Sequence, residues 1–221
     1  MFRNVNVNEI EEIRKYMIVK MIRNKMLSRF KIRGQYYHII VDGTGLATSR
    51  KKYNENCLIK NKTDKNGKEY QEYSTYVLEA KLVIGEMVFS IGSEFVENES
   101  ENVDKQDCET KAFKRLAEKI KKEYPKLRII ISGDALYASK PVMDICKKNK
   151  WKYIIRFKEG AIPTLYKEFE AIVKTDNESK LKKYQSVTKI EYQEYKTNVI
   201  KYTDEKKRNR ICIYNRFKYY R

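Results

Sequence analysis

The sequence predicts an α/β fold in which a mixed sheet follows an N-terminal helix, and further strands follow the sheet. Short β-branched and aromatic runs indicate the strands, while apolar residues spaced three and four apart indicate the helices. With 221 residues, of which 41% are hydrophobic, the chain is long enough to bury a core in one or two domains.

The first segment, residues 1–33, is predicted to be a basic helix. Asn8 and Glu11 form a candidate capping pair near its start. Its apolar residues recur at helical spacing and define one amphipathic face: Ile10, Ile13, Met17, Ile18, Met21 and Ile22.

Three runs of strand type come next. The first, Tyr36–Val41, is β-branched and aromatic, and we expect it to stop at Asp42-Gly43, which is a common turn dipeptide. Two longer strands, residues 73–84 and 87–96, follow with Gly85-Glu86 between them as a tight hairpin signal.

Helices and strands then alternate along the chain. The helix that begins at Asp107 ends before Pro125, and the strand that follows it stops at Gly133-Asp134. The predicted elements are a helix at 107–123, a strand at 127–132, a helix at 139–148, a strand at 151–157 and a helix at 162–173. Three strands followed by helix, strand, helix, strand and helix is the ribonuclease H-like arrangement, which we predict for residues 34–175.

Beyond Asn177 the sequence changes to alternating polar and apolar residues, which is typical of antiparallel strands. We expect strands at 184–195, 198–203 and 210–217. Residues 176–221 therefore form a third segment, the start of a β-rich element.

Charge and composition limit the functions open to this chain. The 48 Lys and Arg residues exceed the 30 Asp and Glu residues, and the net charge of +18 favours nucleic acid as a partner. For residues 1–33 two interpretations stay open: a helix that packs one face and solvates the other, and an arm that contacts DNA. Because no apolar run approaches the length of a membrane-spanning helix and the first residues lack a signal core, we expect a cytoplasmic protein without membrane contact.

Cysteine and histidine usage excludes several chemistries. The four cysteines include no Cys-x-x-Cys pair, and His38 is the only histidine in the sequence. A zinc finger is therefore excluded, and a catalytic pair built on histidine is disfavoured. Any catalysis must depend on carboxylates or on a metal ion that they hold.

Two aspartates, Asp42 and Asp134, lie at predicted strand ends. Ligands collect at the carboxyl ends of strands in an open α/β sheet, and Mg²⁺ or Mn²⁺ prefers carboxylate oxygens. Such a pair in a basic protein suggests metal-dependent phosphoryl transfer on a nucleic acid. Taken singly, Asp42 also fits a turn residue and Asp134 a capping acid, so these alternatives remain open.

Four stretches resemble the DDE-type transposases of bacterial insertion sequences, and the resemblance covers roughly residues 34–217. The stretches are Val41-Asp42-Gly43-Thr44, residues 76–81, residues 105–109 with 112–116, and Gly133-Asp134-Ala135-Leu136-Tyr137-Ala138. The similarity is greatest to the IS-four-like branch, in which a β-rich insertion interrupts the ribonuclease H-like catalytic domain. The motif Gly-Asp-Ala-Leu-Tyr-Ala after an apolar strand is its most specific part.

The resemblance implies DNA transposition. Asp42 matches the first catalytic aspartate of the family and Asp134 the second, both as ligands of Mg²⁺ or Mn²⁺. A metal-activated water would cleave the strand at the end of the element, and the freed 3′-hydroxyl would attack target DNA. The implied partners are double-stranded DNA, as transposon ends and target, and a second copy of the chain in a synaptic complex.

One part of the family pattern is missing. The third carboxylate of the family is a glutamate on a helix after the β insertion, and no such helix follows Phe217. We do not assign its role to Glu159, Glu168 or Glu170, which precede the insertion. The expectation is a transposase truncated before its third acid. Two other hypotheses stay open: an inactive DNA-binding remnant, and a ribonuclease H-like nuclease that acts on RNA–DNA hybrids.

Basic and aromatic residues alternate near the end of the sequence, a pattern that suits phosphate contacts beside base stacking. The candidate nucleic-acid-binding residues are Lys206, Lys207, Arg208, Arg210, Arg216 and Lys218. Lysines that protect a sheet edge are the alternative. For Glu109 the default is an acid at a helix start, with a place beside the site as the alternative, and Trp151 fits sheet packing better than DNA stacking.

Overall fold

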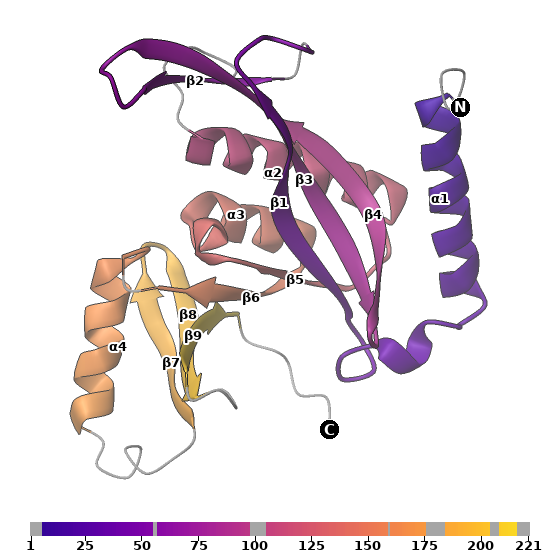
Figure 1. Cartoon of the computed structure of the whole chain (residues 1–221). Coiled ribbons are helices and arrows are strands. Elements are labelled where there is room, and N and C mark those ends of the chain that lie inside the picture. The colour runs from indigo at the N-terminus through magenta and orange to yellow at the C-terminus, as the bar shows by residue number, and fades with distance from the viewer. Residues whose placement is uncertain are drawn as a thin grey trace. The chain divides into compact units, whose positions relative to one another are not determined.

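The computed structural model of the chain describes residues 6–54, 57–97, 105–158, 160–175, 184–203 and 208–215. The chain divides into two compact units, Met1–Arg128 and Ile129–Arg221, which Figure 1 shows from indigo to magenta and from pink to yellow. The mixed α/β class predicted from the sequence is confirmed, and the predicted order of helices and strands is found with one additional strand, β2 (Leu58–Thr63). None of the helices in the described ranges combines the length and the apolar character that crossing a bilayer requires.

An antiparallel sheet forms the centre of the first unit. Its strands are β1 (Tyr37–Ser49), β2 (Leu58–Thr63), β3 (Glu69–Ile84) and β4 (Met87–Val96). The long strand β3 pairs antiparallel with each of the other three. The predicted hairpin between β3 and β4 is present, with Gly85 at a positive φ of 62°. Strand β2 was not predicted, because only two apolar residues, Leu58 and the exposed Ile59, begin it and polar residues follow them.

Strand β1 differs from its prediction at a position that matters for function. We expected it to stop at Asp42-Gly43, and the expectation is wrong, since β1 continues to Ser49. Asp42 pairs with Glu79 and Gly43 with Leu78, so both residues belong to the ladder with β3. Pairing with a long neighbouring strand outweighs the local turn preference of Asp-Gly, and the irregularity falls later, between Gly45 and Ala47.

Helix α2 (Lys105–Glu123) covers one face of this sheet, beside β3 and β4 (Figure 1). The face predicted from the sequence is buried: Ala112, Phe113, Leu116, Ala117 and Ile120. The helix approaches the sheet closely at Gly92, where an added Cβ would lie 3.0 Å from Leu116. Glycine at this point of β4 therefore allows close helix–sheet packing.

Helix α1 (Val7–Arg23) lies along β4, and a short 3₁₀ turn, η1 (Ser28–Phe30), follows it. The predicted capping pair is wrong, because Asn6 is the N-cap and accepts a hydrogen bond from the Asn8 backbone N–H. Glu11 instead accepts a hydrogen bond from Lys119 of α2 at 2.7 Å. The predicted amphipathic face is also only partly buried, with Ile18 inside and Ile10 exposed.

The second unit contains five strands in the order β5-β6-β9-β8-β7. They are β5 (Ile129–Gly133), β6 (Lys152–Phe157), β7 (Tyr184–Tyr192), β8 (Tyr195–Thr203) and β9 (Asn209–Tyr214). Strands β5 and β6 are parallel, and β9 pairs antiparallel with β6. The predicted C-terminal strands are thus present, and they continue the sheet that β5 and β6 begin.

Two helices and a 3₁₀ turn complete the second unit. The turn η2 (Ala135–Tyr137) follows β5, α3 (Lys140–Asn149) connects to β6, and α4 (Pro163–Thr175) packs beside β7. Buried apolar side chains from both helices and the strands form the core, among them Met143, Cys146, Ile155, Phe169 and Val199. Trp151 is also buried, which confirms sheet packing and excludes DNA stacking for it.

Candidate functional site

Asp42 lies in the middle of β1, with an exposed side chain. Directly across the ladder stands Glu79 of β3, so two carboxylates share one face of the sheet. Lys81 is ion-paired with Glu79, at 3.2 Å between Nζ and Oε2. Like charges opposite each other are unfavourable in a sheet, and a cation near Asp42 would relieve this repulsion.

Glu109 of α2 lies on the other side of β1. Its side chain is buried, and its Oε1 is 3.6 Å from the position that a Cβ on Gly43 would take. Successive residues of a strand point to opposite faces, so Asp42 points away from the face that Glu109 covers. Glu109 therefore packs against the backbone next to Asp42 and does not share its face.

Asp134 follows β5 directly, where the sequence placed it. Its Oδ1 accepts a hydrogen bond of 2.9 Å from the Leu136 backbone N–H, and it is the N-cap of η2. The preceding residue must be glycine, because a Cβ on Gly133 would lie 2.7 Å from the buried ring of Tyr137. Gly133 and Tyr137 thus fix the turn that presents the exposed Asp134 carboxylate.

A pocket of about 300 Å³ opens on the sheet of the second unit at the end of β5. Its lining consists of Ser132, Gly133, Ile154, Arg156, Tyr202, Arg210 and Cys212. Arg156 pairs across the ladder with Cys212, and Tyr202 pairs with Arg210, so these side chains share one face. Burial raises the pKa of the Cys212 thiol, and the nearby Arg156 charge opposes this shift. Two arginines and a tyrosine therefore meet beside the strand that leads to Asp134.

Two of the candidate nucleic-acid-binding residues lie in the described part of the chain. Arg208 is exposed just before β9, and Arg210 lines the pocket described above. The other four, Lys206, Lys207, Arg216 and Lys218, lie outside the described residues. Arg156 was not among the predicted site residues, although the alternation in the strand at 151–157 places it opposite the core face.

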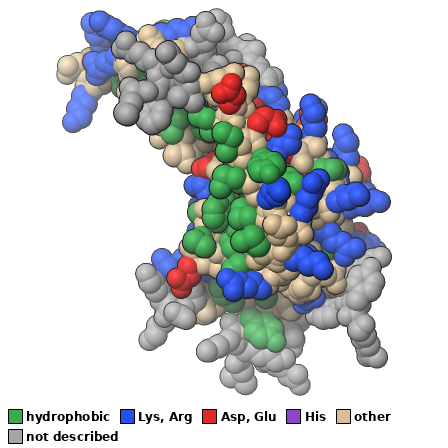
Figure 2. Space-filling view, turned by 90° about the vertical axis from the view of Figure 1, so that its right-hand side faces the viewer, with side chains coloured by type: hydrophobic (Ala, Val, Ile, Leu, Met, Phe, Trp, Pro, Cys, Tyr) green, Lys and Arg blue, Asp and Glu red, His purple; other side chains and the backbone are tan. Residues whose placement is uncertain are grey.

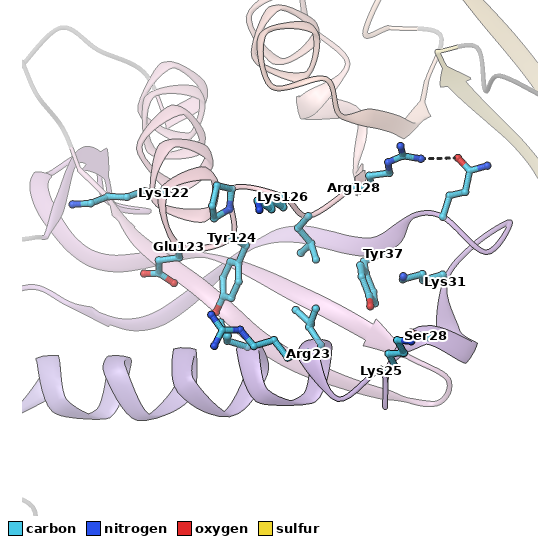
Figure 3. A pocket seen from close by; sticks show the side chains of 15 residues that line it. Arg23, Lys25, Ser28, Lys31, Tyr37, Lys122, Glu123, Tyr124, Lys126 and Arg128 are labelled. Atoms are coloured by element: carbon cyan, nitrogen blue, oxygen red, sulfur yellow. Dashed lines mark hydrogen bonds between the residues drawn. The ribbon is translucent and has the colours of Figure 1, made fainter.

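The first unit contains a larger groove of about 850 Å³ between the C-terminal ends of α1 and α2 (Figure 3). Six cationic side chains line it: Arg23, Lys25, Lys31, Lys122, Lys126 and Arg128. The acid among its lining residues is Glu123, whose pKa is raised by burial and lowered in part by Arg14. The groove was not predicted, because its cations come from two segments that lie about a hundred residues apart.

Side-chain contacts hold parts of this groove in place. The Lys31 ammonium lies 5.1 Å from the centroid of the Tyr37 ring, and the two side chains lie next to each other in Figure 3. The dashed line there joins Arg128 to the Gln35 side chain, a hydrogen bond of 3.2 Å. Tyr37 and Tyr124 are both buried, so they form the floor and leave the cations to meet a ligand.

A family model matches part of the chain. Residues 87–213 match the model described as transposase DDE domain group 1, which is more than half of the 221 residues. The chain belongs to this transposase family. The matched segment runs from β4 to β9, and it includes Asp134 and the pocket residue Arg156, while Asp42 lies before it.

Two solved transposase structures are similar to this chain. One is the cryo-EM structure of the piggyBac transposase synaptic complex with hairpin DNA, at a TM-score of 0.44 and 10% identity, covering 81% of this chain and 33% of that one. The other is the catalytic domain of Mos1 mariner transposase, at a TM-score of 0.30 and 13% identity, covering 68% of this chain and 62% of that one. The chain thus spans less than two thirds of the length of either structure. No curated protein matches it.

Membership of the DDE transposase family raises the question of a divalent metal ion. Among the described residues, no group of three or more His, Cys, Asp or Glu side chains is placed to hold a metal. Mg²⁺ needs fewer protein ligands, because it retains several waters and binds through one or two carboxylates together with substrate phosphates. The exposed carboxylates of Asp42 and Asp134 are hard oxygen donors of this kind.

Proposed function

We propose that this chain forms part of the catalytic region of a DNA transposase. The complete transposase would bind double-stranded transposon-end DNA and carry out metal-dependent strand cleavage and transfer. The observation that carries the proposal is the family match over residues 87–213. It is supported by the exposed Asp134 at the end of β5, with Arg156 and Arg210 in the pocket beside that strand. A cationic pocket next to a carboxylate suits a phosphodiester, whose charge the arginines bind while the carboxylate holds a metal.

Asp42 and Asp134 are the proposed ligands of Mg²⁺ or Mn²⁺. A divalent metal held by these two carboxylates would supply Lewis-acid chemistry for the hydrolysis and transfer of a phosphodiester. Asp134 is held for this role by its hydrogen bond to the Leu136 N–H, so its carboxylate is oriented in advance. A metal at Asp42 would also reduce the repulsion between its carboxylate and that of Glu79, which lies opposite it on the same face of the sheet. No residue of this chain is assigned to the third carboxylate of the family.

Two described surfaces are proposed to bind phosphates of the duplex. One is the groove of the first unit, with its six cations around a buried apolar floor. The other is the pocket with Arg156 and Arg210. Each Lys or Arg that contacts a phosphate releases counterions, so affinity for DNA should fall steeply as the salt concentration rises.

Fluorescence anisotropy with a labelled duplex at several salt concentrations tests the DNA-binding part. We expect Lys122→Gln/Lys126→Gln and Arg156→Gln/Arg210→Gln each to weaken binding about tenfold and to reduce the salt slope by about 2. The matched control is Lys167→Gln/Lys174→Gln, which removes two exposed cations of α4 that line neither surface. Equal losses in all three variants would show binding through net charge alone.

Thermal unfolding with and without Mn²⁺ tests the metal part without requiring activity. The wild-type chain should gain stability from the ion, and Asp42→Asn or Asp134→Asn should reduce that gain. Asn is as good an N-cap as Asp, so Asp134→Asn removes the charge and keeps the turn. An unchanged gain in both variants would exclude these residues as ligands.

Two alternatives correspond to distinct results. DNA binding without any response to Mn²⁺ would favour a catalytically inactive DNA-binding remnant. Cleavage of RNA–DNA hybrids that Asp42→Asn abolishes would favour a ribonuclease H-like nuclease. The IS-four-like branch, the homodimer in a synaptic complex and the cytoplasmic location stay predictions.

A further inference from the structure

Helix α1 presents apolar side chains to solvent along much of its length. The exposed fractions are 52% for Ile10, 59% for Ile13, 61% for Tyr16 and 54% for Met17. Figure 2 shows the face on which α1 lies, and hydrophobic side chains form a band along it with Lys and Arg at its edge. Isolated exposed apolar residues are common on proteins, but a continuous band of them indicates a contact surface.

These side chains are not used to attach the helix to its own unit. The inner face of α1 is held by the buried Ile18 and by two ion pairs to α2. Arg14 pairs with Glu123 at 3.5 Å and Glu11 with Lys119 at 2.7 Å. The packing of α1 against its own unit therefore leaves the apolar band exposed to solvent, where a partner can bind it.

The charged residues beside the apolar band change from acidic to basic along the helix. Along one ridge of the exposed face, at helical spacing, come Glu9, Glu12, Tyr16, Lys20 and Arg23. On this ridge the acids occupy the first half and the bases the second half. Beside the ridge, Lys15 pairs with Glu12 at 3.4 Å on the same exposed surface, and the Lys20 ammonium lies 5.4 Å from the centroid of the Tyr16 ring. At 1.5 Å per residue this ridge spans about 21 Å, long enough for a helix–helix contact.

We infer that α1 pairs with α1 of a second copy of this chain, antiparallel and about a two-fold axis near Tyr16. In that arrangement Glu12 of each copy faces Lys20 of the other, and Glu9 faces Arg23. Ile13 and Met17 of both copies fill the space beside the axis. A parallel pair would instead place acids opposite acids, so the charge order selects the antiparallel arrangement.

Sedimentation of the purified chain without DNA tests the inference. The wild type should form dimers at concentrations of about 100 µM, which corresponds to a modest affinity for one helix pair. Ile13→Ser/Met17→Ser should sediment as a monomer. Leu46→Ser is the matched control, because Leu46 is 62% exposed on β1, outside the band, and this variant should still form dimers.

A charge exchange tests the arrangement. Glu12→Lys and Lys20→Glu should each weaken self-association about tenfold, because each turns two attractions per dimer into repulsions. The double variant Glu12→Lys/Lys20→Glu restores the complementarity and should recover the wild-type affinity. A mixture of the two single variants should form the heterodimer, in which every Glu12–Lys20 contact is again between opposite charges.

Several results would overturn the inference. They are a wild-type chain that stays monomeric at this concentration, one that associates only when DNA is added, and dimers that survive Ile13→Ser/Met17→Ser. Failure of the charge exchange to restore association would exclude the antiparallel pair. Because DNA is absent from these measurements, their outcome is independent of the proposed function.

Discussion

Two aspartate–glycine pairs in this chain have similar sequences and different structures. Asp42-Gly43 lies inside β1, while Gly133-Asp134 ends β5. Gly133 has no room for a Cβ, since Tyr137 would be 2.7 Å away, whereas a Cβ on Gly43 would meet Glu109 at an ordinary 3.6 Å. Asp134 accepts a backbone hydrogen bond, and Asp42 instead faces Glu79 across the ladder.

The two carboxylates are thus positioned by different kinds of contact. Asp134 is oriented by its own turn, so its presentation depends on local contacts within a few residues. Asp42 is oriented by the register between β1 and β3, which joins segments far apart in the sequence. Substitutions at the two pairs should therefore affect stability to different degrees and for different reasons.

The largest difference in stability is expected between substitutions of the two glycines, Gly133 and Gly43. Gly133→Ala forces a Cβ into the Tyr137 ring and should lower the free energy of unfolding by about 2 kcal/mol. Gly43→Ala meets no such contact and should change it by about 0.5 kcal/mol or less. Equilibrium urea unfolding measures both. Equal effects would mean that the turn before Asp134 adapts freely, and the contrast between the two pairs would disappear.

Two substitutions of Asp134 should distinguish the effect of its hydrogen bond on stability from the effect of its charge, and the difference should be smaller. Asp134→Ala removes the cap of η2 and should cost about 1 kcal/mol of stability. Asp134→Asn retains an acceptor for the Leu136 N–H and should remain near wild type in the same urea measurement. If both variants lose the same stability, the charge of Asp134 matters for folding more than its hydrogen bond.

Asp42→Asn should have a smaller effect of the opposite sign. Removing one of two facing carboxylates should raise the free energy of unfolding by about 0.3 kcal/mol at low salt. The gain should shrink as added salt screens the repulsion between the two charges. Glu79→Gln is the control, since it also loses the ion pair with Lys81 and should gain less. A clear loss of stability in Asp42→Asn would show that this carboxylate stabilises β1.

The smallest expected effect is the contribution of His38 to the pH dependence of stability. His38 lies on β1 before Asp42. Burial lowers the pKa of His38 below its ordinary value of 6.5, so the unfolded chain binds this proton more readily than the folded one. Stability should consequently fall as the pH drops through about 6.5. His38→Gln should reduce this dependence in unfolding measured between about pH 7.5 and 5.5. An unchanged pH dependence would locate its origin elsewhere.

Some features of the molecule could be predicted from the sequence because they depend on local patterns. The strand at 127–132, the capping position of Asp134 and the buried face of α2 all follow from apolar periodicity and turn chemistry. The end of β1 was predicted wrongly, because the turn preference of Asp42-Gly43 is local while the ladder to β3 is not. Arg156 was overlooked for a similar reason, since its neighbours Cys212 and Arg210 belong to β9.

Composition, periodicity and short motifs were sufficient to predict most of the helices and strands, the basic charge, the scarcity of histidine and the resemblance to DDE transposases. None of these properties depends on a contact between residues that are far apart in the sequence. Three other features could be found only from the folded chain. Asp42 faces Glu79, two arginines line a pocket at the end of β5, and Ile10, Ile13 and Met17 are exposed. Each of these results depends on which distant segments pair or pack, and that choice is made by the free energy of the whole fold.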